Sequence, residues 1–582
     1  MESETSRIDP QMGRKGPDEA LTAPIGLPLV GTVTATRNKA ILRPRPAETG
    51  PSALDVHPRE GEYPADYAGR LAARYSATAP EEGRQALAQY FTPVKIARYM
   101  TSLAWLPAGS LCLLDPGAGT GVLACALSEL LGKGGGPHRI VAYEVDPNLV
   151  PLCKAALAYA RKWLEGRGVE LDFEVRQEDF VLANTWAVSP DLFSREDAER
   201  FDFAILNPPY FKLSGSDERV VALSKVVHGQ PNIYALFMAV AAGLLKPGGG
   251  MVSITPRSFA AGEYFRHFRR FLLAEMKPEH IHVFGARDEA FREDSVLQEN
   301  VILRLRKACP SKRASVVVTK SVGADDLGDA KKRTYKLSSI VDWESRDAVM
   351  KIPTQDLDDQ ISRFVSSWPG TLMALGVRVS TGPVVAFRAT GYLRRAPVDR
   401  EECVPLLWLQ NVRSMKLSWP VDARGKPQYI VRSPDSARLL VPNGTCVVMR
   451  RFTAKEEPHR LVAAPLRRGQ FPGEVIGLEN HLNYLYRLGG ELSEAEAMGI
   501  SAVLDSELLD QYFRISNGHT QVNATELRSL RFPSSEMILR LGRELLKSNP
   551  GSQDLDRLVM ETLEVPKSIR RSLERRNDAQ TG

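Results

Sequence analysis

The sequence predicts an α/β protein in which a doubly wound sheet carries helices on both faces. Between residues 66 and 310, short β-rich runs alternate with segments of helical apolar spacing, such as residues 153–164 and 234–245. This alternation is typical of parallel strands connected by helices. Seven strands are expected, at residues 111–114, 140–143, 171–175, 203–206, 251–255, 281–284 and 301–305.

The rest of the chain divides into four further segments. A length of 582 residues exceeds one compact core and suggests roughly three or four units. Residues 1–65 are rich in Pro, Gly, Ser, Thr and charge, which favours a flexible leader, and residues 311–370 are polar and basic, which suits a connector or an exposed hairpin. Residues 371–535 contain short strand-like runs between turns, and residues 536–582 have helical spacing and a basic tail.

Composition favours a cytoplasmic, soluble protein. No apolar run approaches the roughly 20 residues that cross a bilayer, and the first residues lack a secretory signal. The six cysteines contain no CxxC pair, so they are expected to be reduced thiols and not metal ligands. The net charge of +6 and the pI near 8.8 permit nucleic-acid binding without requiring it.

The tetrapeptide Asn207-Pro208-Pro209-Tyr210 predicts a site for a planar amino group. It follows a buried strand, and its two prolines prevent a helix from starting there. Open α/β sheets bind their ligands at this end of the strands. The Asn207 side chain and the Pro208 carbonyl can accept hydrogen bonds from an –NH₂ group while Tyr210 stacks on its ring. An ordinary Asn-Pro turn is the structural alternative.

A glycine-rich loop follows the first expected strand, at Asp115-Pro-Gly117-Ala-Gly119-Thr-Gly121. Its glycines let the backbone turn sharply and approach a ligand. The third glycine comes one residue too early for the GxGxxG pattern of dinucleotide-binding loops, so a dinucleotide is disfavoured.

Acidic residues follow the next two strands. Glu144, after the second strand, is expected to accept hydrogen bonds from both ribose hydroxyls of a nucleoside, although a solvated strand end is the alternative. Asp179, after the third strand, can accept from an adenine amino group, and Phe180 can flank the base. The glycine loop, the two acids and the tetrapeptide follow strands one to four in order, which indicates a methyl-donor site that binds a nucleoside.

Residues 87 to about 305 resemble the gamma class of S-adenosylmethionine-dependent DNA adenine-N6 methyltransferases, in which Gln89-Tyr-Phe-Thr-Pro93 would be the first motif. The resemblance implies a Rossmann-like seven-stranded methyltransferase sheet over residues 66–310 and S-adenosyl-L-methionine as cofactor. It places Phe91 and Thr92 at the methionine end of the cofactor, and Phe291 against a flipped target adenine. Phe291 can also be an ordinary loop anchor.

Two further stretches, residues 294–301 and 516–523, are similar to modification methylases of type II restriction systems, including the PstI and BsuBI group. This similarity implies double-stranded DNA as substrate and a separate restriction endonuclease as functional partner. Residues 371–535 would then form the target-recognition domain. The candidates for base contact are Gln410, Asn411, Arg413, Arg450, Arg451, His519 and Gln521.

Three other functions remain compatible with these motifs. RNA bases and the glutamine side chains of proteins present a similar planar amine, so an RNA or protein-amide methyltransferase can use the same tetrapeptide. Cytosine-N4 methylation is the nearest chemical alternative to adenine-N6 methylation. A catalytically silent DNA-binding subunit is disfavoured because the tetrapeptide and the glycine loop are both intact.

Overall fold

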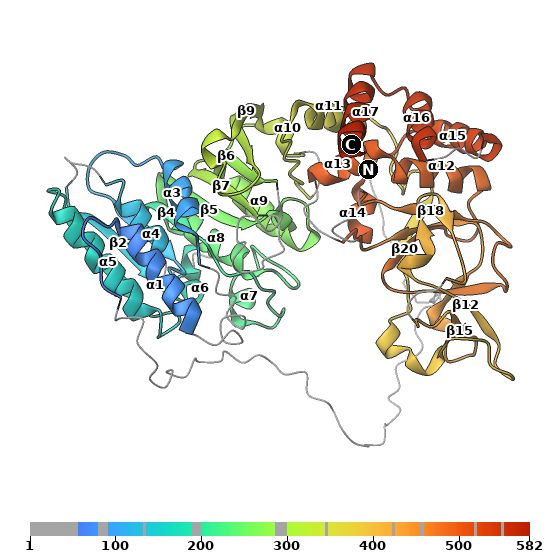
Figure 1. Cartoon of the computed structure of the whole chain (residues 1–582), viewed down its shortest axis with the longest axis horizontal. Coiled ribbons are helices and arrows are strands. Elements are labelled where there is room, and N and C mark those ends of the chain that lie inside the picture. Colours follow the sequence, from blue (N-terminus) through green and yellow to red (C-terminus); the bar gives the residue numbers. More distant parts are fainter. Residues whose placement is uncertain are drawn as a thin grey trace, which may run out of the picture. The chain divides into compact units, whose positions relative to one another are not determined.

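The computed structural model describes residues 56–78, 91–131, 136–188, 199–285, 300–343, 347–421, 425–453, 459–516, 521–548 and 552–581. Most of the expected leader lies outside these ranges. The central element is a nine-stranded sheet (Figure 1). Its strands, in spatial order, are β3 (Leu171–Arg176), β2 (His138–Tyr143), β1 (Cys112–Pro116), β4 (Phe201–Leu206), β5 (Leu245–Pro256), β7 (Asn300–Lys307), β6 (Met276–Phe284), β8 (Ser315–Ser321) and β9 (Lys331–Lys336).

Each of the seven expected strands corresponds to a strand of this sheet, but the sheet differs from the prediction in two ways. Strands β3, β2, β1, β4 and β5 run parallel to one another, whereas β7 is antiparallel to both β5 and β6. The second difference is that β8 and β9 come from the segment 311–370, which was expected to be a connector or an exposed hairpin. Val316 and Val318 of β8 are buried in the core, so this segment belongs to the sheet.

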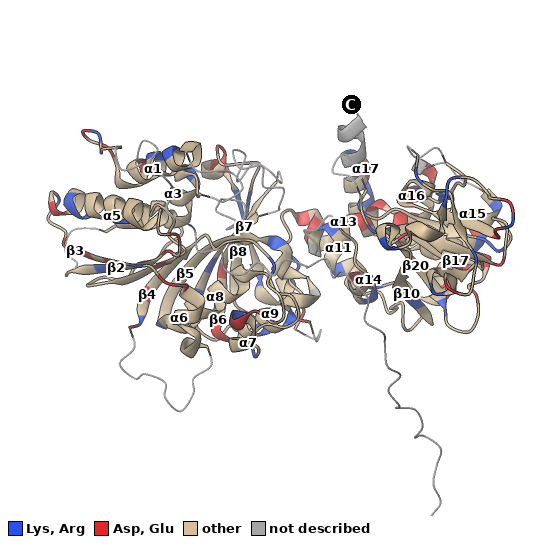
Figure 2. Cartoon of the chain, turned by 90° about the horizontal axis from the view of Figure 1, so that it is seen from below, with Lys and Arg blue, Asp and Glu red and all other residues tan. Residues whose placement is uncertain are grey.

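Helices cover both faces of the sheet (Figure 2). One face carries α1 (Pro64–Thr78), α3 (Val94–Ser102), α4 (Val122–Ser128) and α5 (Val150–Glu165), and the other carries α6 (Phe180–Ala183), α8 (Ile233–Leu244) and α9 (Arg266–Glu275). Helix α8 is buried along its whole length, as its continuous apolar sequence requires. This layering leaves the carboxyl ends of β1, β2, β3 and β4 free to carry the glycine loop, the two acids and the tetrapeptide.

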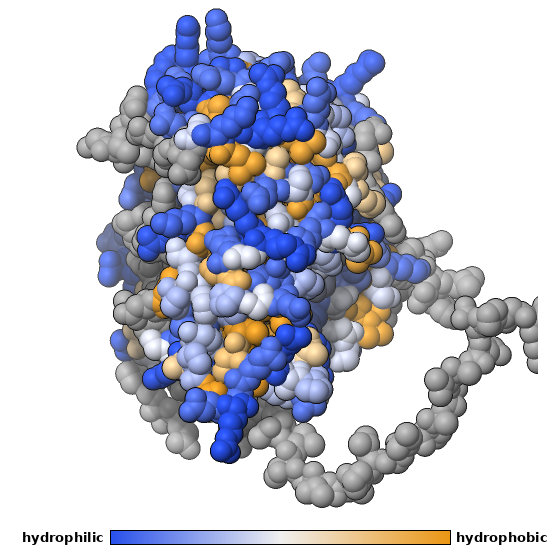
Figure 3. All heavy atoms as spheres, turned by 90° about the vertical axis from the view of Figure 1, so that its right-hand side faces the viewer, coloured by the Kyte–Doolittle hydropathy of each residue, from blue (hydrophilic) through white to orange (hydrophobic). Residues whose placement is uncertain are grey.

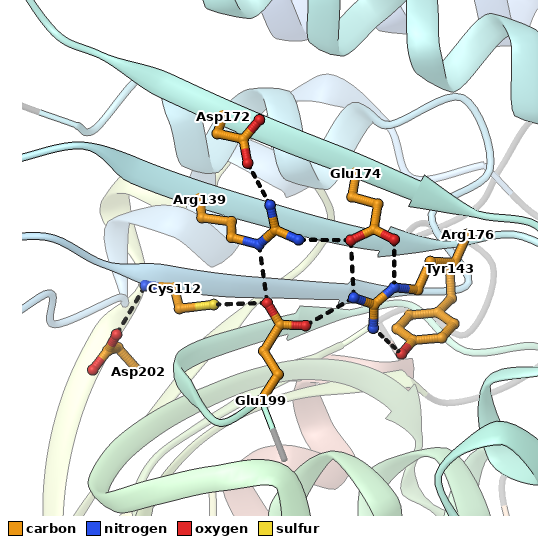
Figure 4. Close-up of polar contacts among 8 residues, drawn as sticks. All are labelled: Cys112, Arg139, Tyr143, Asp172, Glu174, Arg176, Glu199 and Asp202. Carbon is orange, nitrogen blue, oxygen red and sulfur yellow. Dashed lines mark hydrogen bonds and ion pairs between the residues drawn. The ribbon is translucent and has the colours of Figure 1, made fainter. Parts of the chain in front are cut away.

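A network of charges connects the edge strand β3 to its neighbours (Figure 4). Arg139 of β2 bonds to Glu174 of β3 at 2.6 Å and to Glu199, which precedes β4, at 3.0 Å. Arg176 bonds to the same two carboxylates, at 2.9 Å each. Each side chain is partly exposed, so a single pair would contribute little, but shared partners fix the arrangement of the three segments.

The C-terminal part contains two further sheets of four and five strands. The first has the order β10 (Val377–Thr381), β20 (Leu482–Arg487), β17 (Cys446–Arg450) and β18 (Ala463–Leu466). The second has the order β11 (Leu393–Arg394), β15 (Tyr429–Val431), β12 (Cys403–Leu407), β19 (Val475–Leu478) and β16 (Leu440–Pro442). The strand-rich character expected for residues 371–535 is therefore present up to β20.

Helices occupy most of the chain that follows β20. The segment expected to be strand-rich ends in α12 (Glu494–Asp505), α13 (Glu507–Ser516) and α14 (Ala524–Ser529), and the expected helical segment forms α15 (Ser535–Ser548), α16 (Ser552–Thr562) and α17 (Lys567–Thr581). The sequence thus placed the change from strands to helices about 40 residues too late. The basic tail, expected to be solvated, is α17, and it buries Ile569 and Leu573.

Two general expectations from composition concern membranes and disulfides. No helix among the described residues is both long enough and apolar enough to cross a membrane. All six cysteines lie in the described ranges and carry free thiols. Burial raises the pKa of Cys112 and of Cys446 to about 12, so these two thiols are neutral and poorly reactive.

Helices α12 and α15 approach each other through glycines. A Cβ atom on Gly542 of α15 would overlap the carbonyl oxygen of Ala495, and one on Gly499 of α12 would overlap that of Ile538. The two backbones are therefore too close for any side chain at these positions. We expect Gly542→Ala to lower the free energy of unfolding by about 1–3 kcal/mol, measured in urea.

Gly328 provides the matched control for this substitution. It has no atom within 4 Å of a built Cβ, so Gly328→Ala should change the free energy of unfolding by less than about 0.5 kcal/mol. Equal effects of the two substitutions would show that the close approach of the helices does not limit stability.

Candidate active site

The glycine loop connects β1 to α4 in a conformation that only glycine adopts readily. Gly117, Gly119 and Gly121 have φ angles of 73°, 59° and 83°. A Cβ atom on Gly119 would lie 3.2 Å from the Phe91 ring, so a side chain there would close the space between the loop and that ring. The Phe91 ring therefore packs directly against the loop that follows β1.

Asp115 begins this loop, and only one of its two carboxylate oxygens accepts a hydrogen bond among the described residues. Its Oδ2 accepts a hydrogen bond from the Ala124 N–H at 3.0 Å, whereas Oδ1 is buried and has no hydrogen-bond partner among the described residues. Burial, reinforced by the nearby Glu144 carboxylate, raises the pKa of Asp115 to about 7. A buried acceptor without a partner is costly, and a ligand that carries a donor would satisfy it.

Glu144 is held in place by backbone donors on both of its oxygens. Oε2 accepts from the Gly119 N–H and Oε1 from the Asp146 N–H, each at 2.8 Å. Each carboxylate oxygen can still accept a second donor. Burial raises the pKa of Glu144 to about 7 against the opposing effect of these two bonds. Next to it, Val145 is 48% exposed, which gives an apolar surface beside a pair of fixed acceptors.

Asp179 caps the short helix α6 and contacts an arginine. Its Oδ1 accepts from the Leu182 N–H at 3.0 Å, and its Oδ2 lies 3.2 Å from Nη1 of Arg219. The Phe180 ring, expected to flank a base, is only 2% exposed and packs against Tyr143 and Phe237. In this structure the Phe180 side chain thus belongs to the core, and the exposed apolar surface at this edge is Val145.

The structure brings the tetrapeptide to the Phe91–Thr92 segment. Asn207 donates from Nδ2 to Thr92 Oγ1 at 3.0 Å, and its Oδ1 accepts from the Tyr210 hydroxyl at 2.6 Å. Residues 115 positions apart in sequence therefore meet at one amide. Because Thr92 is an acceptor for Nδ2, it fixes which way the Asn207 amide points.

Tyr210 lies inside the core and not on an open surface. It is 8% exposed, its ring meets that of Tyr234 edge to face, and its hydroxyl is also 3.0 Å from the Ile254 carbonyl oxygen. Burial raises the pKa of Tyr210 well above its usual range, so the hydroxyl stays a donor. The stacking role expected from sequence requires this ring to turn out of its present position.

The chain is similar in sequence to known proteins over most of its length. The chain is 34% identical to the type II methyltransferase M.BsuBI of Bacillus subtilis over 491 residues, 83% of this chain and 95% of that protein. It is 32% identical to M.PstI of Providencia stuartii over 499 residues, 84% of this chain and 95% of that one. The chain belongs to this family of type II methyltransferases.

The family profile for the Eco57I restriction-modification methylase matches residues 143–291 of this methyltransferase. That range contains Glu144, Asp179 and the tetrapeptide. Among solved structures, the type IIG restriction endonuclease BpuSI is similar at 15% identity with a TM-score of 0.39, covering 88% of this chain and 66% of that one.

Sequence reasoning missed three residues of this site, namely Arg219, Val145 and Tyr75. Arg219 contacts Asp179, Val145 is exposed beside Glu144, and Tyr75 of α1 donates to Asp146 at 3.0 Å. Only Val145 had a sequence signal, as an apolar residue directly after the second acid. The other two contacts join residues 40 and 71 positions apart, which no local pattern reveals.

The structure describes only some of the residues that were expected to contact DNA. Phe291 and His519 lie outside the described residues, as do Gln89 and Tyr90. Asn411, expected to read a base, is fully buried and bonds to the Trp408 N–H and the Ser418 carbonyl, so it is a structural residue.

The other candidates differ in their accessibility. Gln410 and Arg413 are exposed, whereas Arg450 donates to the Val412 carbonyl and Arg451 to that of Asn480. Hydrophilic side chains cover most of the face of the molecule that Figure 3 shows, with apolar ones in small groups between them. Because their side chains are exposed, Gln410 and Arg413 are the candidates best placed to reach a ligand.

One cluster outside this site has the composition of a metal site. Potential ligand atoms of His459, Glu507 and Asp510 lie within 4.8 Å of one another. The Asp510 carboxylate, however, already accepts from the N–H groups of Arg460 and Leu461 and pairs with Arg514 at 2.6 Å. Its oxygens serve the structure, and a nearby guanidinium opposes a cation.

The two buried acids should make this methyltransferase less stable as pH rises. Since the folded-state pKa of Asp115 is about 7 and its ordinary value is 3.8, the folded chain keeps a proton that the unfolded chain releases between these values. The free energy of unfolding contributed by this group therefore falls from pH 4 to pH 7. Asp115→Asn should raise it by about 2–4 kcal/mol at pH 8 and by less at pH 5.

The asparagine can keep the bond from the Ala124 N–H through its single oxygen, so the substitution removes mainly the buried charge. Urea unfolding at several pH values measures the difference, and Asp399→Asn, at an exposed position, is the control. A gain in stability that does not change between pH 5 and pH 8 would contradict the assignment.

Proposed function

We propose that this chain is a DNA methyltransferase of a restriction-modification system that methylates adenine N6 with S-adenosyl-L-methionine. The observation that supports it best is the hydrogen bond between Asn207 and Thr92. It joins the tetrapeptide to the glycine-loop side of the sheet, so an amine bound at Asn207 lies near a cofactor bound at Glu144. The sequence relatives cover most of the chain and support DNA over RNA or protein as substrate.

The residues at the strand ends fit the cofactor's functional groups. Glu144 has two fixed oxygens for the two ribose hydroxyls, and Val145 offers an apolar surface for the adenine. Asp179 would accept from the adenine amino group. Asp115 has a buried oxygen without a partner among the described residues, in the loop that packs against Phe91, which suits the cationic amino group of the methionine end. S-adenosylmethionine supplies, when bound, an electrophilic methyl group on a sulfonium.

Activation of the target depends on Asn207 and Pro208. The amino group of adenine is a poor nucleophile because its lone pair is delocalised into the ring. Hydrogen bonds from this group to Asn207 Oδ1 and to the Pro208 carbonyl would localise the lone pair on nitrogen. They would also orient the lone pair for in-line attack on the methyl group, with the thioether as leaving group. Thr92 supports this role because it holds Nδ2 and so keeps Oδ1 directed at the target.

The target base must leave the duplex to reach these acceptors, at a cost of a few kcal/mol. In the free protein the Tyr210 hydroxyl donates to Asn207 Oδ1, which is also the atom to which the target amine would donate. For Tyr210 to stack on the adenine, its hydroxyl would have to leave Asn207 and its ring would have to turn outward. Phe291 would pack on the same base.

We assign residues 66–310 to methyl transfer and residues 371–535 to recognition of the DNA sequence. Gln410 and Arg413 are the exposed candidates for base or phosphate contact in that segment. A separate restriction endonuclease would be the functional partner, since modification and cleavage are commonly divided between two chains in such systems, and the chain would act in the cytoplasm.

Replacement of Asn207 by Ala should abolish methylation while leaving cofactor binding nearly unchanged. The substitution removes the side-chain acceptor, which we expect to lower the rate of methyl transfer by at least about 10²–10³-fold. The rate is measured on plasmid DNA, and mass spectrometry of the product distinguishes N6-methyladenine from N4-methylcytosine.

Binding of S-adenosylhomocysteine, followed by calorimetry, shows whether the Asn207→Ala protein is intact. Transfer at the native rate by this variant would refute the catalytic assignment. Methylation by the unchanged protein of tRNA, rRNA or a release factor in place of plasmid DNA would refute the substrate.

Affinity for S-adenosylhomocysteine should fall as pH drops below 7. The pKa of Glu144 is raised to about 7 in the free protein, and ribose hydroxyls donate to its ionised form, so protons compete with the ligand. Below pH 7 we expect a loss of up to about tenfold per pH unit. Calorimetry between pH 5.5 and 8.5 measures this.

Two variants identify which acid causes that pH dependence. Glu144→Gln should bind more weakly with a flatter profile, and Asp115→Asn should remove only the part of the slope that comes from its contact with the methionine end. A profile that is the same in the unchanged protein and in Glu144→Gln would exclude Glu144 as the ribose acceptor.

A further inference from the structure

Arg219 lies in α7 (Glu218–Ala222), nine residues after the tetrapeptide, and links two carboxylates. Its Nε and Nη2 bond to Oδ1 and Oδ2 of Asp217, at 2.8 and 2.7 Å. Its remaining Nη1 reaches Asp179 Oδ2 at 3.2 Å. The Arg219 side chain is only 13% exposed, so a planar guanidinium is fixed by Asp217 and presents its third nitrogen to Asp179.

The Asp179 carboxylate is fixed by these contacts without being saturated. One oxygen accepts from the Leu182 N–H and the other from Arg219. Each oxygen has a second lone pair for another donor, and the Asp179 side chain is 25% exposed. A carboxylate that is held at both oxygens and still accessible is suited to accept one further hydrogen bond in a defined direction.

Stability alone does not require the contact between Arg219 and Asp179. Asp217 already neutralises the guanidinium through both of its oxygens, and a partly exposed ion pair adds little to stability. The additional contact instead orients an acid that the proposed function assigns to the cofactor. Groups that hold a ligand-binding side chain in place commonly determine how well it discriminates between ligands.

We propose that Arg219 is a positioning residue that sets the preference of the cofactor site for adenine. It holds Asp179 in the orientation that accepts the adenine amino group. Hypoxanthine has a carbonyl oxygen at that position, which would face the carboxylate and be repelled. This inference rests on the proposed function. It adds helix α7, which contains Arg219, to the segments that recognise the cofactor.

The test compares S-adenosylhomocysteine with S-inosylhomocysteine, its hypoxanthine analogue, by calorimetry on the full chain. The unchanged protein should prefer the adenine ligand. Arg219→Ala and Arg219→Gln should weaken binding of the adenine ligand about tenfold and change that of the hypoxanthine ligand by less than about twofold. Arg219→Lys should restore part of the preference, because a lysine keeps the positive charge and can still donate to Asp179, whereas glutamine is neutral and shorter.

Arg394→Ala is the matched control, because Arg394 also bonds to a carboxylate through two nitrogens, on Glu401, and lies in the C-terminal part. It should leave both affinities unchanged. An equal loss of both ligands in the Arg219 variants would indicate a merely structural role and overturn the inference, as would unchanged affinities. If Arg219→Ala does not fold, the ratio of the two affinities in Arg219→Lys and Arg219→Gln decides.

The same measurements separate this inference from the proposed function. Absence of S-adenosylhomocysteine binding by the unchanged protein would refute the cofactor itself. Binding by the unchanged protein, together with an unaltered preference in the variants, would refute only the role of Arg219.

Discussion

The site depends on a pair of backbone hydrogen bonds to Glu144. The N–H groups of Gly119 and Asp146 hold both oxygens of this carboxylate, and thereby connect the loop after β1 to the end of β2. A side chain at Gly119 would meet Phe91, so the same residue also brings the Phe91–Thr92 segment against the loop. Because Thr92 in turn bonds to Asn207, the contacts extend from the end of β2 to that of β4.

The protein accepts an energetic cost to arrange these groups. Burial raises the pKa of Asp115 and of Glu144 to about 7, which means that each charge is unfavourable in the free protein. A ligand that donates to both acids would recover part of that free energy. Buried acids with incomplete partners are typical of sites that have to bind tightly, since stability is lowered where function requires unsatisfied groups.

The Asn207 side-chain amide is hydrogen-bonded through both its nitrogen and its oxygen. Thr92 accepts from its nitrogen and Tyr210 donates to its oxygen. The two contacts differ in kind, because the first fixes the direction of the amide and the second uses one of the two lone pairs of its oxygen. The Asn207 amide is therefore oriented by Thr92 through its nitrogen and by Tyr210 through its oxygen.

The sequence by itself determined seven of the nine strands of the large sheet and which residues follow the first four. Local patterns were sufficient here, because apolar runs, positive-φ glycines and an Asn-Pro-Pro turn depend on residues close together in the chain. The apolar run 316–318 is a signal for β8, but the basic residues before it and in β9 favoured a connector. The antiparallel direction of β7 depends on pairing and has no local signal. Local patterns also suggested that Asn411 contacts a base, whereas its side chain is buried and bonds to the backbone.

Only the tertiary structure decided how the site's groups are paired. It put Thr92 against Asn207, Arg219 against Asp179, and the Phe180 and Tyr210 rings into the core. The physical reason is that a residue's type and place after a strand limit what it can bond to, but its partner depends on which distant segments pack together. The local sequence thus indicated which types of side chain follow each strand, and the packing of distant segments determined which of them contact one another.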